Sequence, residues 1–121
     1  METKISVSDF QDHCIKRVNY DSEADALSVA LGSLKSDITI EFTEHILVDM
    51  TNEGKFVGIE ILDASEEISK MFSRIVDKNE IKQLLCEIRQ EPNNEYLIQF
   101  RSPRDNQLVN LIIPLYKGPI V

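Results

Sequence analysis

Apolar and polar residues alternate along the first half of the chain, which is the pattern of strands with one buried face. The alternation predicts strands over residues 16–20, 26–31, 38–42, 46–50 and 57–61. Short polar segments separate these runs, and Gly54 lies in one of them, where it can adopt the positive φ angle of a tight turn. Period-two runs joined by short turns indicate an antiparallel meander with one buried face.

The period changes after residue 62, where apolar residues recur every three or four positions. This is the spacing of one helix face, and it produces two stripes: Ile68, Met71, Phe72 and Ile75, then Ile81, Leu84, Leu85 and Ile88. Asp63 with Glu66, and Asp77 with Glu80, have the spacing of a capping box at a helix start. The pattern predicts either two helices with a break near residues 76–77 or one bent helix, ending at residues 91–94.

The last part of the chain returns to alternation. Tyr96, Ile98 and Phe100 share one face of a predicted strand, and residues 108–115 are apolar on both faces except at Asn110. A hairpin with such a strand needs cover on both sides, so we expect helices on one side and a second subunit on the other. A β-meander followed by helices and a β-hairpin predicts an α+β fold, in which residues 1–121 form one domain.

Charge and composition narrow the classes of partner. The net charge of −8 argues against direct binding to nucleic acid or to an anionic membrane, because both need clustered Lys and Arg, and it suits a basic protein partner. The N-terminus has no apolar leader, and no segment approaches the ~20 apolar residues of a membrane span. We therefore expect a cytoplasmic protein.

Motifs of catalysis and cofactor binding are missing from the sequence. The chain has no GxGxxG, P-loop, GxSxG or HExxH pattern. His13 and Cys14 are adjacent, and adjacent residues on a strand point apart, so they make a poor nucleophile and base pair. The sequence predicts no catalytic residues and no cofactor.

Three carboxylates stand at alternate positions directly ahead of a predicted strand: Asp21, Glu23 and Asp25. A calcium loop of the EF-hand type would need Gly at its sixth position and an acid at its twelfth, where this chain has Ala26 and Gly32. Because Asp side chains bind nearby backbone N–H groups, we prefer the interpretation that these acids shape the turn into the strand. A metal site is the alternative.

Two further acids, Asp49 and Glu60, are candidates for the same acidic site as the opening carboxylates. Asp49 and Glu60 each lie between apolar residues of a predicted strand, so each points to the face opposite the core. If the strands are neighbours, the two acids share a face, together with some of the opening acids. Such a face is either a solvated sheet surface or an acidic patch that binds a cationic partner.

Two motifs, YDSEADAL at residues 20–27 and VGIEILDAS at residues 57–65, together with Val48-Asp49, resemble a small prokaryotic family, domain-of-unknown-function family 2283. The resemblance covers residues 17–70, with Ser28 where the family usually has Tyr. It implies a compact meander followed by a helix, and no established reaction. It also implies that residues 71–121, with their helix and β-hairpin, are an extension of the kind seen in archaeal members. The genes of family members often lie beside genes for small ribonuclease-like toxins, so the resemblance also implies an antitoxin-like role.

These observations favour a non-enzymatic protein-interaction module. We expect a homodimer that pairs through the C-terminal hairpin or the helices, with a basic protein as a further partner. The alternative is a metal-binding or small-ligand-binding domain, or a hydrolase, that uses an acidic cluster. Its candidate residues are Asp21, Glu23, Asp25, Asp49 and Glu60.

Overall fold

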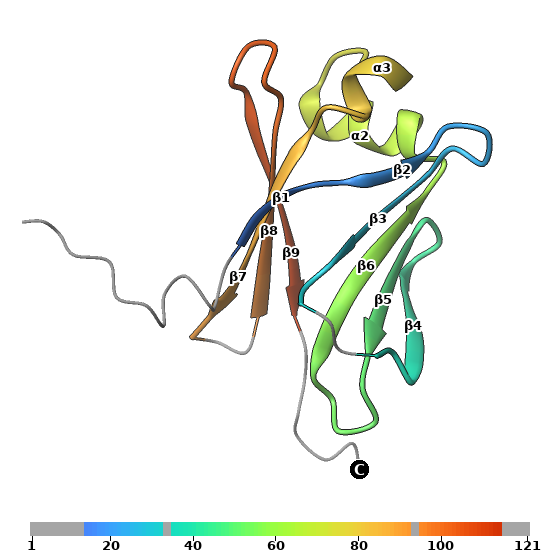
Figure 1. Cartoon of the computed structure of the whole chain (residues 1–121), viewed down its shortest axis with the longest axis vertical. Helices are drawn as coiled ribbons and strands as arrows, with labels where there is room; N and C mark the ends of the chain where they lie inside the picture. The colour runs from blue at the N-terminus through green and yellow to red at the C-terminus, as the bar shows by residue number, and fades with distance from the viewer. Residues whose placement is uncertain (1–13, 33–34, 93–94, 115–121) are drawn as a thin grey trace, which may run out of the picture.

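Two antiparallel sheets and two short helices form the protein in the computed structural model, which describes residues 14–32, 35–92 and 95–114 (Figure 1). The larger sheet has the order β2-β3-β6-β5-β4, from β2 (Asn19–Asp21), β3 (Ala26–Ala30), β6 (Phe56–Leu62), β5 (Ile46–Met50) and β4 (Ile38–Thr43). The smaller sheet has the order β1-β7-β8-β9, from β1 (Cys14–Arg17), β7 (Leu85–Glu91), β8 (Glu95–Arg101) and β9 (Leu108–Pro114). The helices are α2 (Ala64–Phe72) and α3 (Lys78–Ile81). The predicted α+β class is confirmed.

The core lies between the two sheets, with the helices at one end (Figure 1). Leu27 and Ile59 of the larger sheet, Ile68 of α2 and Phe100 of the smaller sheet are all fully buried in one apolar cluster. The ring of Phe56 stacks on that of Tyr96 with 4.4 Å between centroids, which joins β6 to β8 across the core. The alternation of the sequence therefore places its apolar face where the sheets meet.

The first predicted strand is two strands. Residues 14–17 pair with β7 of the smaller sheet, whereas residues 19–21 pair with β3 of the larger one. Val18, between them, is buried, and its backbone N–H donates to the carbonyl of Leu84 at 3.4 Å. The chain thus crosses from one sheet to the other at Val18, which appears as one continuous blue ribbon in Figure 1.

The second predicted helix is wrong beyond residue 81. The helix α3 spans four residues, and residues 85–91 form β7 between β1 and β8. Cys86 and Ile88 are buried while their neighbours Glu87 and Arg89 are only partly covered, so the local period is two. The stripe of Ile81, Leu84, Leu85 and Ile88 has helical spacing, whereas the buried residues Leu84, Cys86 and Ile88 alternate, and pairing on both sides decides for the strand. Neither helix, in the part of the chain described, is long and apolar enough to cross a membrane.

The predicted C-terminal hairpin forms, with β8 and β9 paired from Glu95–Pro114 to Arg101–Leu108. Ile113 faces the core and is fully buried, but Leu108 and Ile112 on the opposite face are each 51% exposed. Cover of that face by a second subunit stays a prediction.

Gly58 marks a close approach between β3 and β6. It pairs with Ala30, and a Cβ atom at residue 58 would lie 2.3 Å from the carbonyl oxygen of Val29. That distance is far inside van der Waals contact, and the obstructing atom is backbone. The glycine of the VGIEILDAS motif is therefore needed for this strand pairing.

Candidate functional site

Asp21 builds the turn that precedes β3. Its Oδ1 accepts hydrogen bonds from the backbone N–H groups of Glu23 at 3.1 Å and Ala24 at 3.2 Å. This is the local side-chain-to-backbone bonding by which Asp favours turns. The turn interpretation of the opening acids is confirmed for Asp21, whereas the side chain of Glu23 lies exposed on the same turn.

Asp25 connects this turn to the start of helix α2. Its carbonyl accepts the N–H of Ala64 at 2.9 Å, and its Oδ1 accepts the N–H of Ser65 at 3.0 Å. Its Oδ2 accepts the hydroxyl of Ser65 at 2.7 Å. The first N–H groups of a helix lack partners within the helix, so Asp25 caps α2 from 40 residues away in the sequence.

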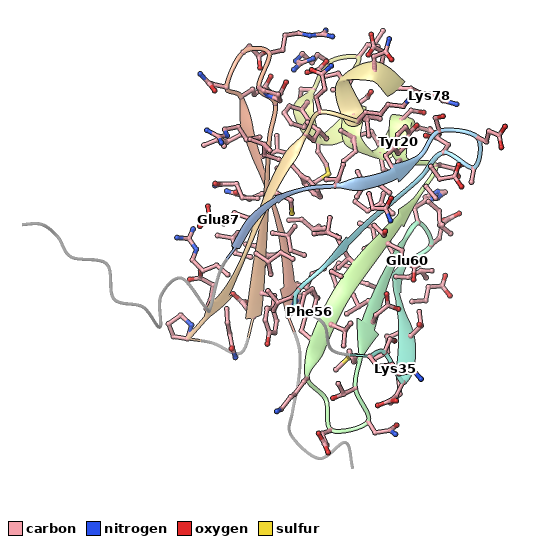
Figure 2. The ribbon with its side chains drawn as sticks, viewed as in Figure 1. Tyr20, Lys35, Phe56, Glu60, Lys78 and Glu87 are labelled. Atoms are coloured by element: carbon pink, nitrogen blue, oxygen red, sulfur yellow. The ribbon has the colours of Figure 1, made fainter. Side chains whose placement is uncertain are left out.

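Tyr20, which is labelled in Figure 2, completes the cluster by donating its hydroxyl to Oδ1 of Asp25 at 2.5 Å. Burial alone would raise the pKa of Asp25, but the hydrogen bonds from Tyr20 and Ser65 outweigh burial and hold that pKa below its ordinary value. Burial, followed by the bond to Asp25, raises the pKa of Tyr20. Asp25 is therefore a carboxylate fixed by donors, which joins the YDSEADAL motif to the VGIEILDAS motif.

The predicted capping box at Asp63 and Glu66 is wrong, because Asp25 takes the capping role. Asp63 has a positive φ of 51° and its side chain makes no capping hydrogen bond. Its Oδ2 instead lies 3.2 Å from Nδ1 of His45. The predicted cap at Asp77 is correct, since its Oδ1 accepts the N–H of Glu80 at 2.8 Å.

Asp49 and Glu60 share the outer face of the larger sheet, as the alternation predicts. Glu60 pairs with Leu47, and Asp49 pairs with Gly58, so the two acids are diagonal neighbours on adjacent strands. Burial, and then the hydrogen bond and charge of Asp49, raise the pKa of Glu60. Asp49 also accepts the hydroxyl of Thr39 at 2.7 Å. The face is acidic, and its two carboxyl groups interact directly.

The opening acids do not gather with this pair in an ion site. Asp21 and Asp25 direct oxygens at backbone N–H groups, as described above. Within the described ranges, no three His, Cys, Asp or Glu side chains are grouped so that they could hold a metal ion. Metal binding by Asp21, Glu23, Asp25, Asp49 or Glu60 stays a prediction.

Glu80 forms a buried ionic cluster that the sequence pattern did not reveal. Its side chain is 1% exposed, and Arg74 binds it through both terminal nitrogens, with Nη1 to Oε1 at 3.0 Å and Nη2 to Oε2 at 2.6 Å. Ser102 donates its hydroxyl to Oε2 at 2.6 Å, and Arg104 lies 3.3 Å from Oε1. The cluster connects the helical segment to the loop between β8 and β9.

Arg74 extends this connection to a second residue of the same loop. Its Nε donates to Oε1 of Gln107 at 3.0 Å, and Gln107 donates to the carbonyl of Phe72 at 3.0 Å. The hydrogen bonds from Arg74, joined by Ser102 and by the charge of Arg104, overcome burial and lower the pKa of Glu80 to about 2. Capping-box spacing at Asp77 and Glu80 was the sequence signal nearby, but it indicates nothing about burial of the Glu side chain.

Exposed apolar residues mark the edges of both sheets. On β4 they are Ile38, Ile40 and Phe42, and on β9 they are Leu108 and Ile112. The same face of the smaller sheet has a shallow depression of about 210 Å³, lined mainly by Leu85, Glu87, Gln99, Arg101 and Leu108. These surfaces offer contacts to another chain.

The fold and these contacts define a small α+β domain in which an acidic turn caps a distant helix. Residues 17–65 match the model of a family described as "Protein of unknown function (DUF2283)". This segment is therefore similar to that family, as the two motifs indicated. No curated protein and no solved structure matches the chain.

Proposed function

We propose that this protein is a non-catalytic interaction module that binds another protein chain and works as a homodimer. The observation that carries the proposal is the row of apolar side chains on β4, where Ile38 is 41% and Ile40 is 46% exposed. Single exposed apolar residues are ordinary. A row of them on a strand at a sheet edge is a surface suited to pairing with another chain.

The roles of the conspicuous acids support the same proposal. Asp21 and Asp25 are occupied by hydrogen bonds that build a turn and a helix start. Glu80 is bound by two arginines and a serine hydroxyl inside the fold. Each of these carboxylates stabilises the module rather than presenting itself to a substrate.

The chemistry of a further partner follows from the acidic outer face of the larger sheet. Asp49 and Glu60 lie together there, and the chain has a net charge of −8. A basic protein surface complements this face and is attracted to it over distance. An antitoxin-like role is the version of this proposal in which the basic partner is a toxin.

Native mass spectrometry tests the proposal on protein taken gently from its own cells. We expect a mass of two 13.9 kDa chains, or of this chain plus another protein. The matched measurement is the molar mass of the purified chain over a wide concentration range. A single-chain mass in both preparations, with no bound protein, would overturn the proposal.

A second candidate function is cation binding at the Asp49–Glu60 pair. Burial, and after it the hydrogen bond and charge of Asp49, raise the pKa of Glu60, and a cation bound between the two carboxylates would relieve the part that is due to the charge of Asp49. Thermal unfolding with and without divalent ions tests it. A ligand at one hundred times its Kd stabilises the folded state by about 2.7 kcal/mol. A stabilisation that is lost in Glu60→Gln supports this candidate, and no shift with any ion removes it.

A further inference from the structure

We propose that β4 pairs with β4 of a second copy of this chain, so that the two larger sheets join into one continuous sheet. The inference rests on the proposed function and specifies its homodimer. It places the interface on β4, whereas the sequence pointed to the C-terminal hairpin or the helices.

The position of β4 leaves it open to such pairing. In the described part of the chain it is the last strand of its sheet, and all six of its residues are exposed. Ile38 pairs with Met50 and Ile40 pairs with Val48, and both partners are buried, so the two isoleucines face the core side of the sheet. Figure 1 shows β4 at the edge farthest from the smaller sheet, which explains why these core-side residues stay uncovered.

The sequence of β4 lacks the devices that usually protect an edge strand. Protection comes from Lys, Pro, inward-pointing charges, very short strands or bulges. The strand ITIEFT has neither Lys nor Pro, and its one charge, Glu41, points to the outer face beside Leu47. By contrast, β2 at the opposite edge has only three residues, and β9 ends at Pro114. The one device of this kind on β4 is an irregularity between Glu41 and Thr43, at Phe42, and it leaves residues 38–41 regularly paired.

The side chains of β4 complement themselves in one antiparallel register. With a two-fold axis at Ile40, that residue faces the partner's Ile40, and Ile38 faces the partner's Phe42. Thr39 then faces the partner's Glu41, a polar pair without like charges. Residues directly opposite in an antiparallel pair share a face, so the central contact between the two Ile40 side chains lies on the core side and the contacts between Thr39 and Glu41 lie on the outer side.

Both neighbouring registers that keep the faces aligned are unfavourable, and the one with its axis at Thr39 places Glu41 opposite the partner's Asp37. A two-fold axis at Glu41 places that residue opposite the partner's Glu41, and like charges directly opposite destabilise a strand pair. The charge pattern therefore selects the axis at Ile40. It also favours a second copy over another occupant, because each chain supplies the matching strand. Since each chain has a net charge of −8, added salt should tighten the dimer by screening repulsion.

Lysine substitution at the two exposed edges tests the interface by sedimentation equilibrium. We expect the wild-type chain to dimerise and Ile40→Lys to weaken the dimer by at least about 100-fold, because two lysines would face each other across the axis. The matched control is Leu108→Lys on β9, which adds the same charge at a similarly exposed position and should leave the dimer intact. Circular dichroism checks that both variants stay folded.

Disulfide trapping tests the register in full-length protein with Cys14 replaced by Ser. Ile40→Cys should form a covalent dimer on mild oxidation, because facing residues have Cα atoms about 4.5–5.5 Å apart, within disulfide range. Glu41→Cys should not, because its nearest counterpart is diagonal, at about 7–8 Å. The chain's own Cys86 is buried. Efficient trapping of Glu41→Cys without trapping of Ile40→Cys would overturn the proposed register.

The outcomes separate this inference from the proposed function. A dimer that Leu108→Lys disrupts and Ile40→Lys spares overturns the β4 interface and keeps the interaction module. A wild-type dimer that neither variant disrupts also overturns the β4 interface and keeps the interaction module. A chain found bound only to a different protein overturns pairing between copies and keeps the module. A single chain without any bound protein overturns both.

Discussion

At the scale of one residue, Asp25 connects the YDSEADAL motif to the VGIEILDAS motif through the start of helix α2. A helix needs acceptors for its first N–H groups, and the residue directly before α2, Asp63, does not supply one with its side chain. Asp25 supplies two acceptor atoms, its carbonyl oxygen and Oδ1, from the turn before β3. The last acid of one motif thus accepts the backbone N–H groups of Ala64 and Ser65, which end the other motif.

Replacing Asp25 should cost more stability than replacing Asp21, although the two acids are four residues apart. Asp25→Asn keeps an acceptor but loses the charge that Tyr20 and both donors of Ser65 bind. We expect a loss of about 1–3 kcal/mol in the free energy of unfolding, measured in urea. Asp21→Asn, which changes only an exposed turn, is the matched control and should cost about 0.5 kcal/mol or less. Equal losses in both variants would contradict the capping role of Asp25.

Glu80 should make stability depend on pH in the acid range. Its folded pKa of about 2 lies below the ordinary value of 4.5, so its contribution is complete above pH 4.5 and is lost as the pH falls toward 2. At neutral pH, Glu80→Gln should lower the free energy of unfolding by about 2–4 kcal/mol, because it removes the buried carboxylate that binds the half-buried Arg74. The measurement is urea unfolding at several pH values, with the exposed Glu53→Gln as control.

The gap between the wild-type protein and Glu80→Gln should narrow as the pH falls from 4.5 toward 2. A gap of constant size over that range would show that the carboxylate charge of Glu80 is not what stabilises the fold.

At the scale of elements, periodicity predicted strands better than it predicted the second helix. The strands β3 and β5 alternate cleanly between buried and more exposed residues, because one face meets the core and the other faces away from it. In β7, by contrast, Leu85 and Ile88 lie three positions apart, which imitates a helix, and the strand is fixed only by its partners β1 and β8. Those partners lie far away in the sequence, so a local pattern could not reveal them.

The candidate sites also divide into those that local sequence pattern predicts and those that depend on contacts between residues far apart in the sequence. The shared face of Asp49 and Glu60 could be predicted, because it follows from alternation on two strands. The cap on α2 by Asp25 and the cluster around Glu80 could not, because both depend on contacts across 22 to 40 residues. The local spacing of Asp63 and Glu66 even favoured Asp63 as the residue that caps α2. Tertiary contacts overrode a sequence signal that was sound in itself.

The pairing of β3 with β6 should be sensitive to a single methyl group at residue 58. In Gly58→Ala the new Cβ would lie 2.3 Å from the backbone oxygen of Val29, so the strands must move apart. We expect a loss of about 1–3 kcal/mol in the free energy of unfolding, measured by thermal or urea denaturation. Ser28→Ala, on the same face and opposite Glu60, is the control and should change stability by about 0.5 kcal/mol or less. An unchanged Gly58→Ala variant would contradict the close approach.

At the scale of the whole molecule, the family segment and the rest of the chain share one core. Residues 17–65 contribute Leu27 and Ile61, and the later strands contribute Ile98, Phe100 and Ile113, all almost completely buried in one cluster. The chain also passes between the sheets twice, at Val18 and through the two helices. The later strands therefore cover the apolar face of the family segment.

A fragment that ends at residue 76 should consequently fail to fold cooperatively on its own. Without β7, β8 and β9 it would expose Phe56 and the core side of the larger sheet, and it would lose the partner strand of β1. We expect no sharp thermal transition by circular dichroism and strong binding of a hydrophobic dye. Adding residues 77–121 as a separate peptide should restore the transition in part, because that peptide carries the missing core residues. A sharp transition of the short fragment alone would show instead that the family segment is an independent domain, to which the later strands are merely attached.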